Sequence, residues 1–217
     1  MSKLDLRNMD CMDLMREYPD KYFELAIVDP PYMARWSGKF AAGSGISTTG
    51  VARDVRGFKH WDVPKRQYFL ELNRVSKNQI IWGCNYYAKH IDSVGRIIWD
   101  KKNDSSTFSK AEIASCSLNY GIQMFRYGWN GMIQEDMKNK EIRIHPTQKP
   151  VALYKWLLHN YAKQGDKIFD SHLGSGSIAI ACHQMGFDLV GSELDKDHFE
   201  AMQMRIKYET AQRDLFL

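Results

Sequence analysis

The sequence holds little that would suit a secreted or membrane-bound protein. It has only four cysteines among 217 residues, and they show neither metal-ligand spacing nor the density of a disulfide scaffold. No apolar run approaches the roughly 18 residues of a membrane span, and the charged start of the chain lacks the apolar centre of a signal peptide. We therefore expect a cytoplasmic protein with reduced cysteines, no metal site and no membrane contact.

A large excess of charge of one sign is also missing. The chain carries 30 lysines and arginines against 26 aspartates and glutamates, and the net charge of +4 permits an anionic partner without requiring one. With 44% hydrophobic and 26% charged residues, the composition is that of a globular protein, and the length suits a single domain over 1–217. The positive excess lies between residues 35 and 66, where periodicity is lost and a long functional loop is expected.

The spacing of apolar residues predicts an alternation of strands and helices. Strands are expected over residues 3–7, 23–28, 79–83, 96–100, 113–118, 123–127, 167–170 and 187–191. Helices are expected over residues 10–17, 68–75, 151–162, 178–185 and 197–211. Such alternation implies an α/β fold in which a parallel sheet is covered by helices on both faces.

A glycine-rich turn joins the strand over 167–170 to the next helix. Gly174 and Gly176 lie where a backbone can approach a ligand closely and where the first amides of a helix point outward. Glu193 follows 17 positions after Gly176, at the end of the next strand, where a carboxylate can accept both hydroxyls of a ribose. The pattern predicts a nucleoside cofactor, although a glycine turn alone is equally typical of an ordinary strand-to-helix corner.

The tetrapeptide Asp29-Pro30-Pro31-Tyr32 follows directly on an apolar strand. Because the prolines fix φ and lack amide hydrogens, the carbonyls around them are held as acceptors in a set direction, and Asp29 adds another acceptor. Two convergent acceptors suit the exocyclic amino group of a base. The ring of Tyr32 offers a face on which a planar base can stack after it has left a nucleic-acid double helix. Accepting both amine hydrogens makes the nitrogen a nucleophile toward a positively charged methyl donor. The alternative is a proline-rich strand exit without chemistry.

With these two motifs in this order, the chain resembles the amino-group DNA methyltransferases of the permuted class called β. These enzymes make N6-methyladenine or N4-methylcytosine from S-adenosylmethionine, and the similarity is greatest to the small phage-type members. The resemblance covers nearly the whole chain, including the motif at 145–150. It implies a Rossmann-like, seven-stranded mixed sheet of the class I methyltransferases, circularly permuted, with a small recognition insertion.

The resemblance also assigns roles to residues. The catalytic residues would be Asp29, Pro30, Pro31 and Tyr32, and the product of the cofactor would be S-adenosylhomocysteine. Many relatives have Pro-Phe where this chain has Ser171-His172, so the packing at the methionine end departs from the family pattern. The residues expected to bind S-adenosylmethionine are Asp10, His145, Thr147, Gln148, Lys149, Asp170, His172, Leu173, Gly174, Ser175, Gly176, Ser177 and Glu193.

The basic loop over 33–66 is expected to contact DNA and to recognise the target, although charged runs are often only solvated surface. The segment over 101–144 is a second candidate for a DNA-facing surface. Double-stranded DNA is therefore the expected partner, and the small recognition portion is compatible with a homodimer and with a cognate restriction enzyme. The residues expected to contact DNA are Arg35, Trp36, Lys39, Arg53, Arg56, Lys59 and Trp61.

We expect site-specific methylation of a flipped adenine at N6, because aspartate rather than serine opens the catalytic motif. The alternatives are N4-cytosine methylation, methylation of RNA or of a protein side-chain amide, and a non-catalytic nucleic-acid-binding subunit that keeps the cofactor fold. Methylation of cytosine at C5 is excluded, because it needs a nucleophilic cysteine after a proline and the chain has no Pro-Cys pair.

Overall fold

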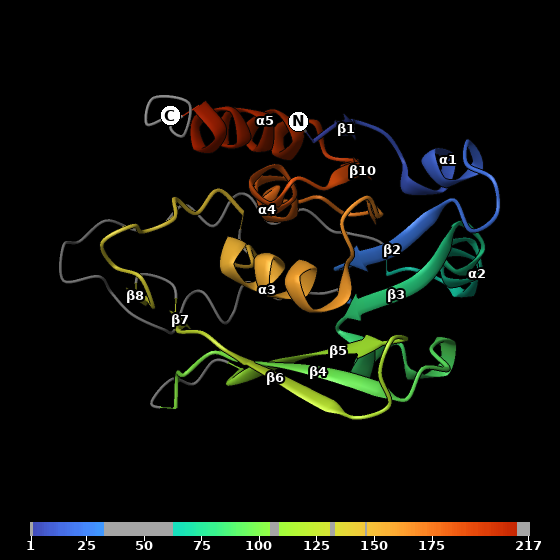
Figure 1. Cartoon of the computed structure of the whole chain (residues 1–217), viewed down its shortest axis with the longest axis horizontal. Helices are drawn as coiled ribbons and strands as arrows, with labels where there is room; N and C mark the ends of the chain where they lie inside the picture. The colour runs from blue at the N-terminus through green and yellow to red at the C-terminus, as the bar shows by residue number, and fades with distance from the viewer. Residues whose placement is uncertain (1, 33–62, 105–108, 131–132, 146, 212–217) are drawn as a thin grey trace.

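A computed structural model describes residues 2–32, 63–104, 109–130, 133–145 and 147–211. A mixed sheet of eight strands crosses the molecule (Figure 1). Every pair of neighbouring strands is parallel except the two pairs that include the strand Ala111–Cys116, which runs antiparallel to both of its neighbours. The strands, in spatial order, are β1 (Leu4–Arg7), β10 (Asp188–Ser192), β9 (Lys167–Asp170), β2 (Phe23–Val28), β3 (Ser76–Trp82), β5 (Ala111–Cys116), β4 (Gly95–Asp100) and β6 (Ile122–Arg126).

The predicted α/β class is confirmed, but the strand count of seven is wrong. All eight segments with a strand pattern form strands, and the eighth, β6, extends the sheet by pairing with β4 at its edge. Most β6 residues are exposed, but Phe125 packs on Trp156, with ring centroids 5.5 Å apart. A short hairpin of β7 (Trp129–Asn130) and β8 (Ile133–Gln134) follows outside the sheet.

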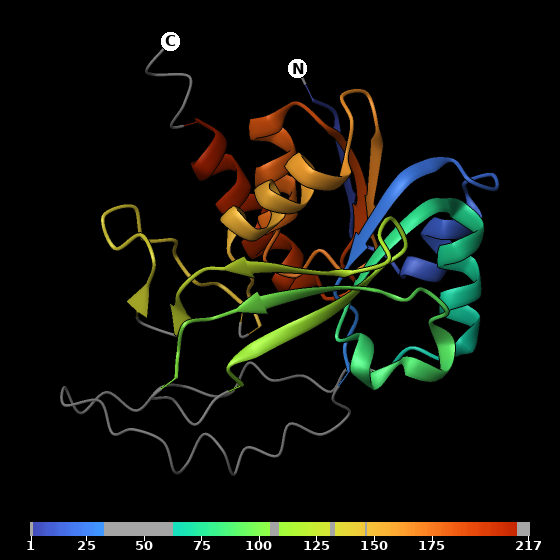
Figure 2. The same ribbon diagram turned by 60° about the horizontal axis from the view of Figure 1, so that its bottom comes forward.

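Five α-helices form in the described part of the chain, all where the sequence predicts them. They lie in two groups, one on each side of the strands (Figure 2). The first group is α1 (Cys11–Arg16) and α2 (Arg66–Val75), and the second is α3 (Val151–Tyr161), α4 (Ser177–Met185) and α5 (Lys196–Ala211). Two short 3-10 helices, η2 (Cys84–Tyr86) and η3 (Ala88–His90), follow β3. None of the helices in the described ranges is both long and apolar enough to cross a membrane.

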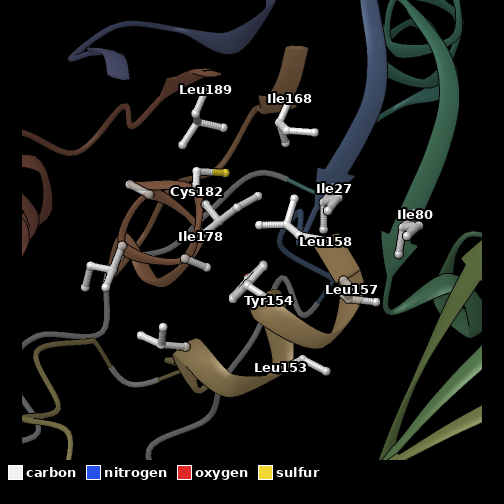
Figure 3. Close-up of a cluster of buried hydrophobic side chains, with 14 of the residues drawn as sticks. Ile27, Ile80, Leu153, Tyr154, Leu157, Leu158, Ile168, Ile178, Cys182 and Leu189 are labelled. Carbon is white, nitrogen blue, oxygen red and sulfur yellow. The ribbon is translucent and has the colours of Figure 1, made fainter. Parts of the chain in front are cut away.

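The core lies in two layers, one on each face of the sheet. Leu25 and Ile27 of β2 contribute to the layer under α3, α4 and α5, whereas Ala26 and Val28 contribute to the layer under α1 and α2. Because β2 is buried on both faces, its sequence is a continuous apolar run rather than an alternating one. Figure 3 shows the α3 side, where Leu157 and other buried side chains of α3 gather near the strands.

The parallel strands bring distant parts of the chain to one edge of the sheet. Residues Leu25 and Ala26 of β2 pair with Ile168 and Phe169 of β9, and β9 pairs in turn with β10. The turns that follow these parallel strands therefore open on the same edge. This edge carries the segment after β2, the glycine turn after β9 and the acid after β10.

Candidate active site

The two motifs singled out in the sequence meet at this edge. Asp29 directly follows β2, and Asp170 is the last residue of the adjacent strand β9. Burial, assisted by the negative charges of Asp29 and Glu193, raises the pKa of Asp170 to about 8. The two aspartates therefore lie within electrostatic reach of each other, as a shared reaction site requires.

The two carboxylate oxygens of Asp29 have different surroundings. Oδ2 accepts a hydrogen bond from the ammonium of Lys149, whose side chain is 2% exposed. Oδ1 is buried and has no hydrogen-bond partner among the described residues. Burial raises the pKa of Asp29 above its ordinary value, Lys149 opposes this shift, and Glu112 adds to it. A buried acceptor without a donor costs about 1–3 kcal/mol, so Oδ1 suits a donor that a ligand supplies.

The carbonyls of the double proline are held by a tyrosine that sequence reasoning missed. The hydroxyl of Tyr87 donates to the carbonyl oxygens of Pro30 and Pro31, at 3.0 and 2.5 Å. Tyr87 is 2% exposed and follows η2, 56 residues beyond Pro31. No local pattern marks it, because the contact depends on the pairing of β2 with β3.

We expect Tyr87→Phe to lower the free energy of unfolding by about 1 kcal/mol, because two carbonyls lose their donor. Urea denaturation followed by tryptophan fluorescence measures this change. Tyr86→Phe is the matched control, since the Tyr86 side chain is exposed and its ring remains in place. Equal stability of the two variants would contradict the structural role of the Tyr87 hydroxyl.

Tyr32 lies in an aromatic stack beside the double proline. Its ring is 4.6 Å from that of Tyr86, with an angle of 7° between the planes, and Tyr86 is 56% exposed. The turn between β3 and η2 allows this approach because it contains Gly83, which has a φ of +68°. A Cβ at position 83 would lie 2.5 Å from the Tyr32 ring, so a side chain there would displace the ring.

Gly83→Ala is therefore expected to destabilise the protein by about 1–2 kcal/mol through backbone strain, with further loss from the displaced Tyr32 ring. Urea denaturation measures the effect. Gly121→Ala is the control, because a Cβ at that position has no neighbour within 4 Å and φ there is ordinary. Indistinguishable stabilities of the two variants would show that Gly83 is not required for the stack.

The glycine turn after β9 is hydrogen-bonded to Glu193, which follows β10. Oε2 of Glu193 accepts a hydrogen bond from the backbone amide of Gly174 at 2.9 Å, and Oε1 accepts one from the amide of Asp195 at 2.9 Å. Gly176 has a φ of +72°, and a Cβ there would lie 2.5 Å from Met202 of α5. Position 176 therefore requires glycine for two reasons: the backbone has a positive φ, and the side chain of Met202 leaves no space for a Cβ.

His145 lies over the same turn. Its ring atoms are 3.8 Å from where a Cβ at Gly174 would lie, and the ring packs edge-on against His198 with centroids 4.6 Å apart. Burial, with the nearby charges of His198 and Lys149, lowers the pKa of His145 to about 3. Its Nδ1 accepts a hydrogen bond from the amide of Thr147 at 3.3 Å. His145 is therefore a neutral ring that bounds the space above the glycine turn.

Several other residues expected to bind the cofactor have side chains that face the protein interior. The amide of Gln148 bonds to the backbone of Ile144 and Ile142, and the side chain of Leu173 is buried in the core. Arg205 of α5 donates to the Ser175 carbonyl at 2.8 Å and to the Ser177 hydroxyl at 2.9 Å. A ligand above this loop would meet its backbone, because these side chains support the loop from behind.

The Ser171-His172 pair is packed by a tyrosine from α2. The Tyr68 hydroxyl lies 2.6 Å from Oγ of Ser171, which in turn lies 2.8 Å from Nδ1 of His172. Burial lowers the pKa of His172 to about 4, against the opposing charge of Asp10. Asp10 itself accepts from the Met12 amide at 2.7 Å and caps α1. Asp10 and His172 therefore lie within electrostatic reach of each other, and their expected contacts with the cofactor stay predictions.

Lys149 contacts the catalytic motif. Its ammonium lies between Asp29 and Glu112, 3.0 Å from Oε2 of Glu112, and its expected contact with the cofactor stays a prediction. The residues expected to contact DNA lie outside the described part of the chain. They are Arg35, Trp36, Lys39, Arg53, Arg56, Lys59 and Trp61. In the segment over 101–144, Lys102, Lys110, Lys138 and Lys140 are exposed, but Lys101 pairs with Glu112. No cluster of three or more potential metal ligands forms among the described residues.

Comparison with protein families decides the class of this protein. Residues 78–204 match the model of the N6/N4 DNA methylases, described as DNA methylase, which covers more than half of the chain. The chain belongs to this family. The type II methyltransferase M2.DpnII of Streptococcus pneumoniae is 27% identical over 213 residues, which cover 96% of this methylase and 74% of the relative.

Solved structures confirm the fold of the methylase. A complex of M1.HpyAVI with S-adenosylmethionine has a TM-score of 0.56 at 15% identity, over 93% of this chain and 99% of the other. The cytosine-N4-specific PvuII DNA methyltransferase has a TM-score of 0.61 at 10% identity, over 98% of this chain and 93% of the other. At these identities the two structures establish the α/β fold of the methylase and leave its target base undecided.

Proposed function

We propose that this DNA methylase transfers a methyl group from S-adenosylmethionine to the N6 amine of an adenine flipped out of double-stranded DNA. The observation that carries the proposal is the unpartnered Oδ1 of Asp29 beside the fixed carbonyls of Pro30 and Pro31. These atoms are acceptors only, so together they match the two hydrogens of an exocyclic amine.

The cofactor side of the edge fits S-adenosylmethionine. Glu193 supplies a carboxylate for the ribose hydroxyls, and Gly174 leaves space below the His145 ring where a side chain would stand. When bound, the cofactor supplies an electrophilic methyl group on a positively charged sulfur. A neutral His145 would add no positive charge to the space above the glycine turn, where a cationic cofactor would be disfavoured by one. The M1.HpyAVI structure, which has a similar fold, holds the same cofactor.

The protein's own residues act on the amine by position and electrostatics. Asp29 and the Pro30 carbonyl accept the two hydrogens of the amine, and this concentrates the lone pair on nitrogen. Tyr32 offers the ring face that Tyr86 does not cover to the flipped base. As the new N–C bond forms and the bond between the methyl carbon and sulfur breaks, the amine loses one proton to Asp29 or to water, so the products would be the neutral methylated amine and S-adenosylhomocysteine.

Adenine is proposed over cytosine because aspartate opens the motif, although N4 of cytosine presents the same two hydrogens. Unmethylated DNA made by polymerase chain reaction, incubated with the protein and S-adenosylmethionine and then digested to nucleosides, tests this. Mass spectrometry should detect N6-methyladenine, and N4-methylcytosine in its place would assign the other base. RNA and protein acceptors belong in the same assay. DNA binding without transfer to any acceptor would favour a non-catalytic subunit.

The proposed partner is double-stranded DNA, contacted by the segment over 33–66 and by the exposed lysines of the segment over 101–144. Light scattering with and without DNA tests whether two copies share one target. Sequencing the DNA of a host strain for methylated positions, with and without this protein, identifies the target sequence and shows whether it coincides with the site of a cognate restriction enzyme.

A further inference from the structure

Four side chains of alternating charge form a row that ends at Asp29. Nζ of Lys101 lies 2.5 Å from Oε1 of Glu112, whose Oε2 lies 3.0 Å from Nζ of Lys149. The Lys149 ammonium then bonds to Oδ2 of Asp29. None of the four side chains is more than 20% exposed. The row was not predicted, because Glu112 has no distinctive sequence context.

The fold brings these residues together from four separate segments. Lys101 follows β4, Glu112 lies in β5 opposite Trp99 of β4, Lys149 precedes α3, and Asp29 follows β2. The Lys149 ammonium also lies 5.6 Å from the centroid of the Trp82 ring. The row therefore runs from the outer strands of the sheet to the centre of the active-site edge.

Stability alone is a weak reason for such a row. Removing a lysine ammonium from water costs several kcal/mol, and a buried ion pair recovers this only in good geometry with further hydrogen bonds. An apolar group of similar volume would often serve folding equally well. What the row provides is asymmetry at Asp29, because Lys149 occupies Oδ2 while Oδ1 stays without a donor among the described residues.

We propose that Lys149 and Glu112 are positioning residues for methyl transfer: Lys149 fixes Oδ2 of Asp29 so that Oδ1 faces the target amine, and Glu112 fixes Lys149. Lys101 anchors Glu112 at the outer end of the row. The inference rests on the proposed function, because it assumes that Asp29 accepts a hydrogen bond from the amine. It gives Lys149 a role at the acceptor base rather than at the cofactor.

The charges of the row also set the ionisation of Asp29. Against the effect of burial, Lys149 and Lys101 hold the pKa of Glu112 at about 2, and the two carboxylates raise the pKa of Lys149 above its ordinary value. Both therefore stay charged. Around Asp29, Lys149 and Lys101 lower its pKa and Glu112 raises it. The other titratable groups within electrostatic reach of Asp29 are Tyr32, Tyr87, Tyr154 and Asp170.

The test compares Lys149→Met and Glu112→Gln by their rates of single-turnover methyl transfer between pH 5 and 9. The substrates are S-adenosylmethionine and unmethylated DNA made by polymerase chain reaction. A protonated Asp29 is a weaker acceptor and cannot take up the proton that the amine loses, so the rate falls as the pH drops through the pKa of Asp29. Loss of Lys149 should move the acidic side of the pH–rate profile to higher pH by about one unit or more. Loss of the Glu112 charge should move it to lower pH.

Cofactor affinity separates this role from cofactor binding. Calorimetry should find that Lys149→Met binds S-adenosylmethionine within about threefold of the wild type, while its rate on the plateau falls at least about tenfold. The matched control is Glu24→Gln, because Glu24 pairs with Lys77 at 3.0 Å near the opposite end of β2. Glu24→Gln should leave the pH profile unchanged.

The outcomes distinguish the two hypotheses. If the wild type transfers methyl groups but both variants keep its pH profile, or shift it in the same direction, the inference is wrong and the proposed function stands. Loss of cofactor affinity in Lys149→Met would also overturn the inference. A wild type that methylates no DNA overturns the proposed function and the inference together. If Lys149→Met does not fold, Glu112→Gln decides, because glutamine preserves the side-chain volume.

Discussion

Asp29→Ala should lower the rate of methyl transfer at least about 100-fold while the affinity for S-adenosylmethionine stays near that of the wild type. The substitution removes an acceptor that acts when charge develops on the amine, and loss of one such preorganised hydrogen bond typically costs a factor of about 10²–10³. The cofactor contacts proposed for Glu193 and the glycine turn do not involve Asp29, so ground-state binding of the cofactor is retained.

Single-turnover transfer of labelled methyl groups measures the rate, and calorimetry measures the affinity. Asp92→Ala is the control, because Asp92 is an exposed aspartate between η3 and β4. It should behave like the wild type in both measurements. An Asp29→Ala variant that retains most of its rate would remove Asp29 from the reaction.

Glu193→Ala should have the opposite effect and weaken binding of S-adenosylmethionine about 10- to 100-fold. Hydrogen bonds to a charged group contribute about 1.5–3 kcal/mol, and alanine would remove those proposed to the ribose. It would also release the Gly174 and Asp195 amides, which the Glu193 carboxylate holds. The glycine turn would then lose part of its fixed conformation before the cofactor arrives.

Calorimetric titration with S-adenosylmethionine checks this prediction. Glu200→Ala is the matched control, because Glu200 lies in the first turns of α5 and its ion pair with Lys196, at 3.8 Å, is exposed. At saturating cofactor, Glu193→Ala should recover much of the wild-type transfer rate. An affinity equal to that of Glu200→Ala would exclude Glu193 from the cofactor site.

Much of the fold could be predicted because each element carries a local signal. The apolar run before Asp29 reflects a strand buried on both faces, and the stripe that includes Met202 and Ile206 reflects a helix packed on its neighbours. The predicted strand count was wrong for a different reason. It came from the family resemblance, whereas periodicity had indicated β6 as well as the other seven strands.

Candidate site residues could be predicted where they stand in a short motif or, like Glu193, at the end of the strand that follows one. Asp29 to Tyr32 and the glycine turn are short motifs, and the pairing of β2 with β9 confirms that they share an edge. Tyr87 and Glu112 stand in no motif, and their roles depend on the antiparallel β5 and on the turn after β3. Lys149 belongs to a recognisable motif, yet its partner lies 120 residues away.

Local periodicity and adjacent side chains are enough to predict the class of fold, the order of the motifs and the residues that could serve an amine and a nucleoside cofactor. Tertiary structure alone decided which buried charges meet. Strand order brings Glu112 of β5 near the end of β2, the segment before α3 brings Lys149 between Glu112 and Asp29, and no local rule encodes this arrangement. The physical reason is that an ion pair forms through distance in space, which the separation of two residues along the chain does not specify.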